Sequence, residues 1–312
     1  MKLPSFSVVQ NRLIGYLFSA TVFLASVIVI AVWGIPLGVD FTGGNRLEVT
    51  IAPSDISLDV EKINKKIETL GLGSFSIQAS VNGLLVIRSQ NLLTPTDEEL
   101  ILSSIRNIAK EQSDQVVVEK LTSYAIGPVI GQELRAKSFL AIGLVLIAII
   151  LFITFSFRKV SEPVASWKYG ITAIIALIHD VVITIGTFSV LGYFFGAEAD
   201  TLFVTALLTV LGFSVHDTIV VFDRVRENLK QNTKDFGTIV SQSVNQTAGR
   251  SIANSFTSLL VLASIIIFGG ESIRWFVSTL FIGILIGTYS SIFVAAPLLV
   301  DFQKKSFSSK SL

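Results

Sequence analysis

Residues 201–228 read TLFVTALLTVLGFSVHDTIVVFDRVREN, and this stretch decides the fold class. From residue 201 to residue 222 the only charged side chain is Asp217, which directly follows His216. A helix of about 20 apolar residues crosses a hydrocarbon layer of roughly 30 Å. The stretch therefore predicts a transmembrane helix that carries a histidine and an aspartate about five residues from its C-terminal end.

Apolar stretches of similar length recur along the chain, at residues 14–35, 138–157, 170–194, 252–269 and 275–299. The 312 residues are 51% hydrophobic and 15% charged, whereas soluble proteins have about 25% charged residues. We therefore predict a polytopic α-helical membrane protein with six transmembrane helices. The first apolar stretch is too long for a signal-peptide core, so we expect it to remain as an anchor.

Composition also excludes several kinds of chemistry. The chain has no cysteine, which excludes disulfides, thiol catalysis and cysteine-bound metals. It has only two histidines, His179 and His216, and a net charge of +1 that gives no indication of nucleic-acid binding. We predict no metal site, no cofactor and no nucleic-acid partner.

Basic residues are concentrated in alternate short loops, and this sets the expected orientation. They lie before the first span, between the second and third, between the fourth and fifth, and after the sixth: Lys2, Arg12, Arg158, Lys159, Lys168, Arg224, Arg226, Lys230, Lys234, Arg250, Lys304, Lys305 and Lys310. By the positive-inside rule both termini are cytoplasmic. The expected segments are a cytoplasmic N-terminus (1–13), a first helix (14–35), an external domain (36–137), helices two to six (138–299) and a cytoplasmic tail (300–312).

The pattern of the external domain predicts two helices and four strands. Alternation predicts strands in RLEVTIA, SFSIQASV, GLLVIRS and QVVVEKL, and helical spacing predicts helices in SLDVEKINKKIETLG and TPTDEELILSSIRNIAKEQ. Asn82-Gly83 predicts a hairpin turn, and Thr94 with Pro95 predicts a helix start. The order β-α-β-β-α-β predicts a ferredoxin-like α+β fold. Since it contains no histidine, cysteine or phosphate-binding loop, we expect an interaction or structural module.

Two aspartates inside predicted spans are the candidate functional residues. An aspartate at a helix centre costs about 2.5–3.5 kcal/mol on insertion, so we expect Asp180 and Asp217 to be partnered and to face the bundle interior. Two polar stripes are expected to face the interior as well. Their residues are Thr201, Thr205, Thr209, Gly212 and His216 on the fourth span, and Arg250, Asn254, Thr257 and Ser258, with Ser251 and Ser255 beside them, on the fifth.

Two interpretations of the polar residues stay open at this point. In the first, the polar residues form a proton relay of Asp217, Arg250, Asp180, His179 and His216. Burial raises the pKa of a carboxyl and a nearby arginine lowers it, so a carboxyl balanced between the two can gain and lose a proton. In the second, Asp217 is paired or reaches the membrane surface, and His179 is a neutral packing residue.

Five motifs occur in a fixed order and carry a resemblance to a known family. They are GVDFTGG (38–44), SYAIGPVIGQEL (123–134), ALIHDVVITIG (176–186), GFSVHDTIVVFDRVREN (212–228) and QTAGRSIANSFTSLL (246–260). Together they resemble the SecF family of protein-export membrane subunits, which belongs with SecD to the resistance-nodulation-division superfamily.

The resemblance implies an accessory subunit of the bacterial Sec protein translocase that uses the proton-motive force with SecD. It implies a place in the bacterial cytoplasmic membrane, with SecD, the SecYEG channel, YajC/YidC-type membrane factors, the unfolded translocating polypeptide and protons as partners. By position, Asp217 is the proton-carrying carboxylate, Arg250 its partner and Asp180 the family's third-span acid. His216 departs from the asparagine expected there. The resemblance also implies structural roles for Gly38, Asp40, Gly43, Gly44, Gly127 and Pro128.

Two other functions compete with this one. A small-molecule exporter of the same superfamily shares the embedded acids but usually carries larger external domains. An intramembrane aspartyl protease would pair Asp180 with Asp217, yet the expected Gly-x-Gly-Asp is replaced by Ser214-Val215-His216-Asp217. We therefore predict a proton-coupled translocation subunit and not an enzyme. Six spans form half of a twelve-span transporter, so a second six-span chain is expected.

Overall fold

The structure is a computed structural model that describes residues 8–53, 59–79, 83–112, 115–157, 165–231 and 235–308. The chain forms two compact units, Met1–Pro36 with Ala141–Leu312, and Leu37–Leu140. Six helices are long and apolar enough to cross a membrane, which confirms the predicted class. They are Arg12–Trp33, Pro128–Ser156, Ser166–Phe195, Thr201–Lys230, Phe236–Phe268 and Ser272–Gln303.

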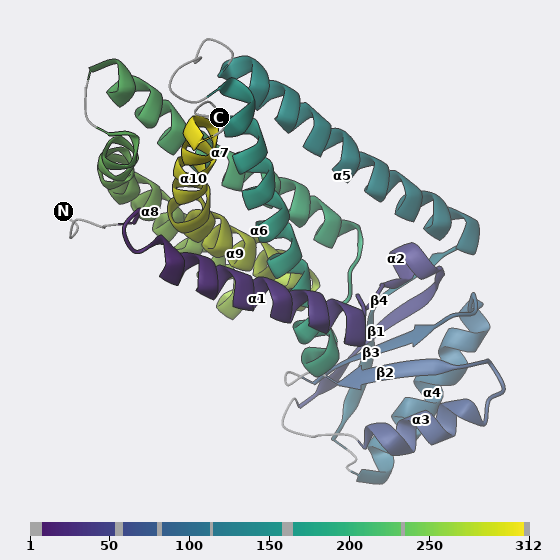
Figure 1. Cartoon of the computed structure of the whole chain (residues 1–312). Coiled ribbons are helices and arrows are strands. Elements are labelled where there is room, and N and C mark those ends of the chain that lie inside the picture. The colour runs from purple at the N-terminus through teal and green to yellow at the C-terminus, as the bar shows by residue number, and fades with distance from the viewer. Residues whose placement is uncertain are drawn as a thin grey trace. The chain divides into compact units, whose positions relative to one another are not determined.

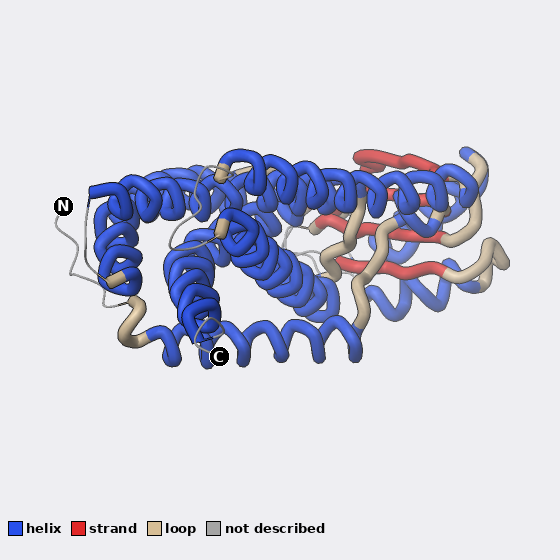
Figure 2. The backbone as a smooth tube through the Cα atoms, turned by 45° about the horizontal axis from the view of Figure 1, so that its top comes forward, coloured by secondary structure: helices blue, strands red, loops and turns tan. Residues whose placement is uncertain are grey.

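The unit of residues 37–140 contains the four-stranded sheet, drawn red in Figure 2. Its elements are β1 (Gly44–Ala52), α3 (Val60–Glu68), β2 (Phe75–Ala79), β3 (Leu84–Ser89), α4 (Pro95–Gln112) and β4 (Val117–Ile126). The strands lie in the order β2-β3-β1-β4, and every neighbouring pair is antiparallel (Figure 1). This topology confirms the ferredoxin-like prediction; Asn82 of the predicted turn lies outside the described residues.

The helices of this unit form where the sequence provides caps and one apolar face. Asp59 accepts hydrogen bonds from the backbone N–H groups of Glu61 and Lys62 and so caps α3. At the start of α4, Thr94 and Asp97 bond reciprocally, the Thr94 N–H to Asp97 Oδ2 and the Asp97 N–H to Thr94 Oγ1. Both helices bury isoleucines against the sheet in one core, which includes Ile63, Ile67, Ile101, Ile105, Leu47, Val49 and Ile87.

Two of the predicted structural motifs meet where this sheet begins and ends. The short helix α2 (Val39–Thr42) follows Gly38 and contains Asp40, and it leads through Gly43 into β1. Gly43 has a φ of +76°, and a Cβ there would lie 2.8 Å from Pro128 Cα. Gly44 pairs with Ile126, the last residue of β4, and Gly127 alone separates β4 from α5 (Pro128–Ser156). The close approach of two backbones therefore explains the glycine at position 43.

The other unit consists of helices. Its elements are α1 (Arg12–Trp33), the larger part of α5, α6 (Ser166–Phe195), α7 (Thr201–Gln231), α8 (Phe236–Phe268), and a last span that runs through α9 (Glu271–Ser290), the π-helical segment η1 (Ser291–Ala295) and α10 (Ala296–Ser308). Helices α6, α7 and the last span are the most buried, whereas α1, α5 and α8 are largely exposed. The central helices therefore carry the buried polar residues.

Several helices extend beyond the apolar stretches that predicted them. The stretch 138–157 lies within α5, which begins at Pro128, and the stretch 252–269 belongs to α8, which begins at Phe236. Hydropathy marks only the apolar part of a helix, while its backbone hydrogen bonds continue through polar residues. The orientation stays a prediction, because several of the basic residues on which it rests lie outside the described part of the chain. They are Lys2, Arg158, Lys159, Lys234 and Lys310, together with the side chains of Lys304 and Lys305.

Candidate functional site

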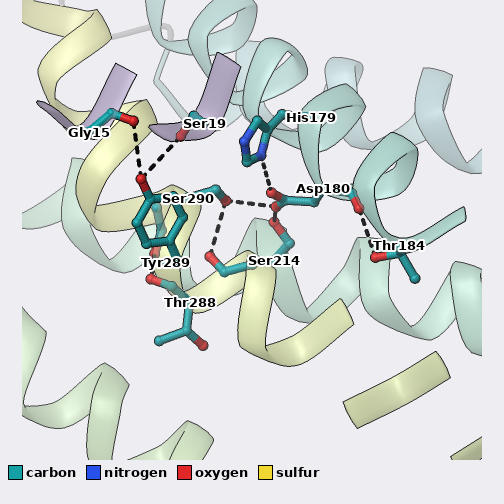
Figure 3. Close-up of polar contacts among 11 residues, drawn as sticks. Gly15, Ser19, His179, Asp180, Thr184, Ser214, Thr288, Tyr289 and Ser290 are labelled. Carbon is teal, nitrogen blue, oxygen red and sulfur yellow. Dashed lines mark hydrogen bonds and ion pairs between the residues drawn. The ribbon is translucent and has the colours of Figure 1, made fainter. Parts of the chain in front are cut away.

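The carboxylate of Asp180 lies in a cluster of side chains from three helices (Figure 3). Asp180, on α6, is fully buried, and its Oδ1 is 2.9 Å from Nδ1 of the preceding His179. Its Oδ2 accepts two hydroxyl hydrogen bonds, from Ser214 of α7 at 2.5 Å and from Ser290 of α9 at 2.7 Å. The cost of burying this acid is therefore offset by hydrogen bonds from neighbouring helices.

The geometry of this cluster restricts where a proton can reside. Oδ2 accepts two hydroxyl groups, and the contact between Asp180 and His179 is made by Oδ1 and Nδ1, which share one hydrogen. The other ring nitrogen, His179 Nε2, is buried without a hydrogen-bond partner. The ring stacks on Phe23 of α1, with centroids 6.3 Å apart. His179 and Asp180 thus lie in a site lined by residues of α1, α6, α7 and α9.

The carboxylate of Asp217 has a separate set of partners. Asp217, on α7, is 2% exposed. It accepts a hydrogen bond from Thr288 Oγ1 of α9 at 3.3 Å and another from Ser251 of α8. Thr288 is in turn 2.6 Å from the Ser255 hydroxyl of α8. Hydroxyl groups from two helices therefore surround the carboxylate, and hydroxyls can bond either the charged or the neutral form.

The predicted approach of Arg250 to Asp217 is not present in this structure. Arg250 is exposed, and the ion pairs of the described residues do not include these two side chains. Arg250 instead lines a pocket of about 360 Å³ between the C-terminal part of α7 and the N-terminal half of α8, with Val220, Asp223, Arg224, Glu227, Gln246 and Thr247. The reason is local: Ser251 faces Asp217, and the preceding residue points about 100° away around the helix.

The two predicted polar stripes are only partly buried in this chain: Ser251 and Ser255 face the interior, but most of the other residues do not. On α7, Thr205, Thr209, Gly212 and His216 are exposed, and on α8 Asn254 and Thr257 are exposed with Arg250. Helical spacing shows that such residues share a face, but it does not say what covers that face. His216 therefore lies apart from the His179–Asp180 cluster.

The two aspartates do not form the shared pair that a protease would need. Asp180 bonds Ser214 and Ser290, whereas Asp217 bonds Ser251 and Thr288. Sequence reasoning does not predict the contributions of Thr288 and Ser290. Their signal is the run Thr288-Tyr289-Ser290-Ser291, four hydroxyl residues inside an apolar span. Across the described ranges, no group of three or more His, Cys, Asp or Glu side chains could hold a metal ion.

Comparison with known proteins gives consistent matches over the whole chain. The family described as "Protein export membrane protein SecD/SecF, C-terminal" matches residues 106–305, and the "SecD/SecF GG Motif" matches residues 28–54. The protein translocase subunit SecF of Thermobaculum terrenum is 39% identical over 312 residues, which cover 96% of this chain and 95% of the relative.

Longer proteins match as well. The protein translocase subunit SecDF of Brucella abortus is 34% identical over 90% of this chain but only 36% of its own length. The crystal structure of SecDF from Thermus thermophilus, described as a translocon-associated membrane protein, has a TM-score of 0.82 at 29% identity and covers 96% of this chain and 39% of that one. This chain therefore spans nearly all of the SecF relative but well under half of each SecDF chain.

Proposed function

The chain belongs to the SecF branch of the SecD/SecF family, as its five motifs predicted, and on that premise we propose that it uses the proton-motive force with SecD to promote protein export by the bacterial Sec translocase. Its relatives are named translocase subunits, which supports a role in transport and not in enzyme catalysis. The observation that supports a proton-driven mechanism is the burial of the Asp217 carboxylate. It is held by the hydroxyls of Ser251 on α8 and Thr288 on α9, and Arg250 directly precedes Ser251.

Asp217 and Arg250 act as a pair whose contact depends on the proton. A charged Asp217 inside the membrane attracts a cation, and arginine stays charged at every accessible pH. A neutral Asp217 needs only the Ser251 and Thr288 hydroxyls, which leaves Arg250 in its pocket, as observed here. The present arrangement therefore fits the state in which Arg250 is released. His179 and Asp180 form a second acid site of the relay, and His216 faces outward from α7.

The exposed polar faces of α7 and α8 support an association with SecD. The hydroxyls of Thr205, Thr209 and Thr257 bond carbonyls of their own helices, but the exposed Asn254 side chain is costly in lipid, so another membrane chain would cover this face. The SecDF relatives, of which this chain covers 36% and 39%, fit a partner that is larger than this chain. SecYEG, YajC/YidC-type factors and the unfolded polypeptide are the further partners of the proposed complex.

Export would be driven by movement of the external domain. In the proposed topology both termini are cytoplasmic and residues 36–137 lie outside the cytoplasmic membrane. Loss and gain of the Asp217 proton shifts α7 and α8, and the shift reaches the domain through Gly127 and Pro128, where β4 joins α5. Each proton supplies about 2.3 kcal/mol per 100 mV and about 1.4 kcal/mol per pH unit, so a few protons supply several kcal/mol.

Gradient-dependent export from membrane vesicles tests this function. Asp217→Asn and Arg250→Met are each expected to abolish the part of export that depends on the proton gradient, while gradient-independent export and co-purification with SecD persist. Ser264→Ala is the control, because its exposed hydroxyl bonds only the Leu260 carbonyl of its own helix. Normal gradient-dependent export by Asp217→Asn would show that Asp217 has a structural role only.

A further inference from the structure

Three consecutive residues of the last span contact four other helices, and Figure 3 shows those contacts for Tyr289 and Ser290. Thr288 bonds Asp217 on α7 and Ser255 on α8. Tyr289 donates its hydroxyl to the Gly15 carbonyl of α1 and accepts a hydrogen bond from Ser19. Ser290 donates to Asp180 on α6. A single helical turn therefore touches both buried carboxylates, although the two acids share no hydrogen bond with each other.

The two hydroxyl groups next to the acids each have a competing acceptor. A hydroxyl carries one hydrogen. Thr288 Oγ1 lies 3.3 Å from Asp217 Oδ2 but 2.9 Å from the Ile284 carbonyl of its own helix. Ser290 Oγ lies 2.7 Å from Asp180 Oδ2 and 3.2 Å from the Gly287 carbonyl. Because a charged acceptor forms the stronger bond, the charge on each acid decides whether its hydroxyl bonds the neighbouring helix or its own.

The backbone changes character directly after this turn. Residues Ser291–Ala295 form the π-helical segment η1, within a span that is otherwise α-helical. Single π-helical turns inside α-helices often occur at functional sites, and they are points where a helix bends. Just before the turn in sequence, Gly283 and Gly287 let α9 lie against Val210 and Ser214 of α7. A small shift of the turn therefore changes contacts to α6 and α7 together.

From this arrangement we propose that the turn of Thr288, Tyr289 and Ser290 couples the two buried acids, so that the proton state of Asp217 changes the hydrogen bonding of Asp180 and His179. Thr288 and Ser290 are positioning residues that act through the carboxylates, and Tyr289 fixes the turn to α1. The proposal rests on the proposed proton-driven function and adds to it a route between the two acid sites.

The ionisable groups around each acid indicate the route that a change at Asp217 can take. Near Asp217 they are His216 on the same helix and Arg250 beside Ser251 on α8, while α9 presents hydroxyls. Around Asp180 the ionisable neighbour among the described residues is His179, and α7 and α9 present Ser214 and Ser290. A change at Asp217 can therefore reach His179 by two routes, along α7 through Ser214 or through Thr288 and Ser290 of α9. The proposed route is the one through α9, and variants of Thr288 separate it from the other.

The two-histidine composition provides a direct test in the full-length chain. Histidine labelled with nitrogen-15 gives imidazole signals from His179 and His216 only, and His216→Gln identifies the second. Asp217→Asn replaces the carboxylate with a neutral group of the same shape. We expect Asp217→Asn to shift the His179 signals. In a Thr288→Val background this shift should fall by half or more. In a Thr288→Ser background, which keeps the hydroxyl, the shift should be restored.

Thr279→Val is the matched control, since this buried threonine of α9 bonds only its own helix, at the Trp275 carbonyl. In that background the response of His179 to Asp217→Asn should be unchanged. The coupling is contradicted if His179 does not respond to Asp217→Asn, or if the response is the same in Thr288→Val as in the native chain. The readout does not involve export, so a failed coupling is distinguishable from a failed proton-driven function.

Discussion

At the scale of single residues, Asp180 and Asp217 lie on adjacent helices but have different surroundings. Asp180 is bonded by His179, Ser214 and Ser290, whose own helices hold them in place. Asp217 has Ser251 and the longer contact to Thr288, and lies near a pocket that contains charged residues. The denser hydrogen bonding of Asp180 makes it the better candidate for stabilising the fold, and Asp217 the better candidate for exchanging a proton.

Removing one of the hydroxyl groups that donate to Asp180 should therefore lower the free energy of unfolding. Ser214→Ala leaves the buried Oδ2 with one hydroxyl partner in place of two. We expect a loss of about 0.6 kcal/mol, the average for hydrogen bonds between membrane helices, and at most about 1.7 kcal/mol. Thermal unfolding of the purified chain measures it. Ser264→Ala should leave the unfolding temperature unchanged, and an equal effect of both variants would argue against a structural role of this contact.

In the sheet-containing unit, Glu98 makes stability depend on pH. Burial alone raises the pKa of this carboxyl, but the hydrogen bonds from Lys120 and Ser123 and the charge of Lys120 outweigh it and hold the pKa below its usual value. A depressed pKa contributes stability that is present above the pKa of the unfolded chain and is lost as the pH falls through the lower, folded value.

Glu98→Gln should therefore destabilise α4 and β4 at neutral pH by about 1–2 kcal/mol, and the difference should shrink as the pH falls below about 4. Hydrogen exchange of the α4 and β4 amides measures it in the full chain. Glu99→Gln is the control, because the Glu99–Arg106 pair is exposed and such pairs contribute little. A pH-independent effect of Glu98→Gln would contradict a stabilising role of the Glu98 charge.

At the scale of elements, the packing of α9 on α7 depends on small residues. A Cβ at Gly283 would lie 2.2 Å from Val210 Cγ2, and both positions are buried. Gly283→Ala should destabilise the helical unit by about 1–3 kcal/mol through overpacking. Adding Val210→Ala should recover part of the loss, because the double variant provides room for the new methyl group.

Gly143 of α5 is the matched position for this comparison, since a Cβ there meets nothing within 4 Å. Gly143→Ala should leave the unfolding temperature of the purified chain unchanged. Strictly additive effects of Gly283→Ala and Val210→Ala would show that the two residues do not limit the approach of these helices.

Elements were more predictable than their faces. Alternation in RLEVTIA and helical spacing in TPTDEELILSSIRNIAKEQ predict their elements, because periodicity reports directly on which side chains are buried. The outward stripe at Thr205 and Thr209, the position of Arg250 and the contacts of Thr288 and Ser290 were not predicted. These features depend on which helices are neighbours and on whether a helix face packs against this chain or against a partner. The spacing of polar residues along one helix determines neither.

At the scale of the whole molecule, the proposed function requires a defined orientation in the membrane. The chain has no cysteine, so single cysteines can be introduced without background. The outer membrane, where there is one, is first removed and the cytoplasmic membrane is left intact. Lys66→Cys, exposed on α3, should then react with a membrane-impermeant maleimide added outside. Thr238→Cys, exposed at the start of α8, should react only after the membrane is opened. The opposite pattern would reverse the proposed topology.

Proton entry during export tests the central claim most directly. Vesicles that contain the Sec channel, SecD and this chain would hold a pH-sensitive dye while a secreted protein is translocated. We predict that proton flux rises with translocation for the native chain and for Ser264→Ala, and that Asp217→Asn removes this increase. Substrate-coupled flux of native size through Asp217→Asn would contradict the claim that Asp217 carries the proton.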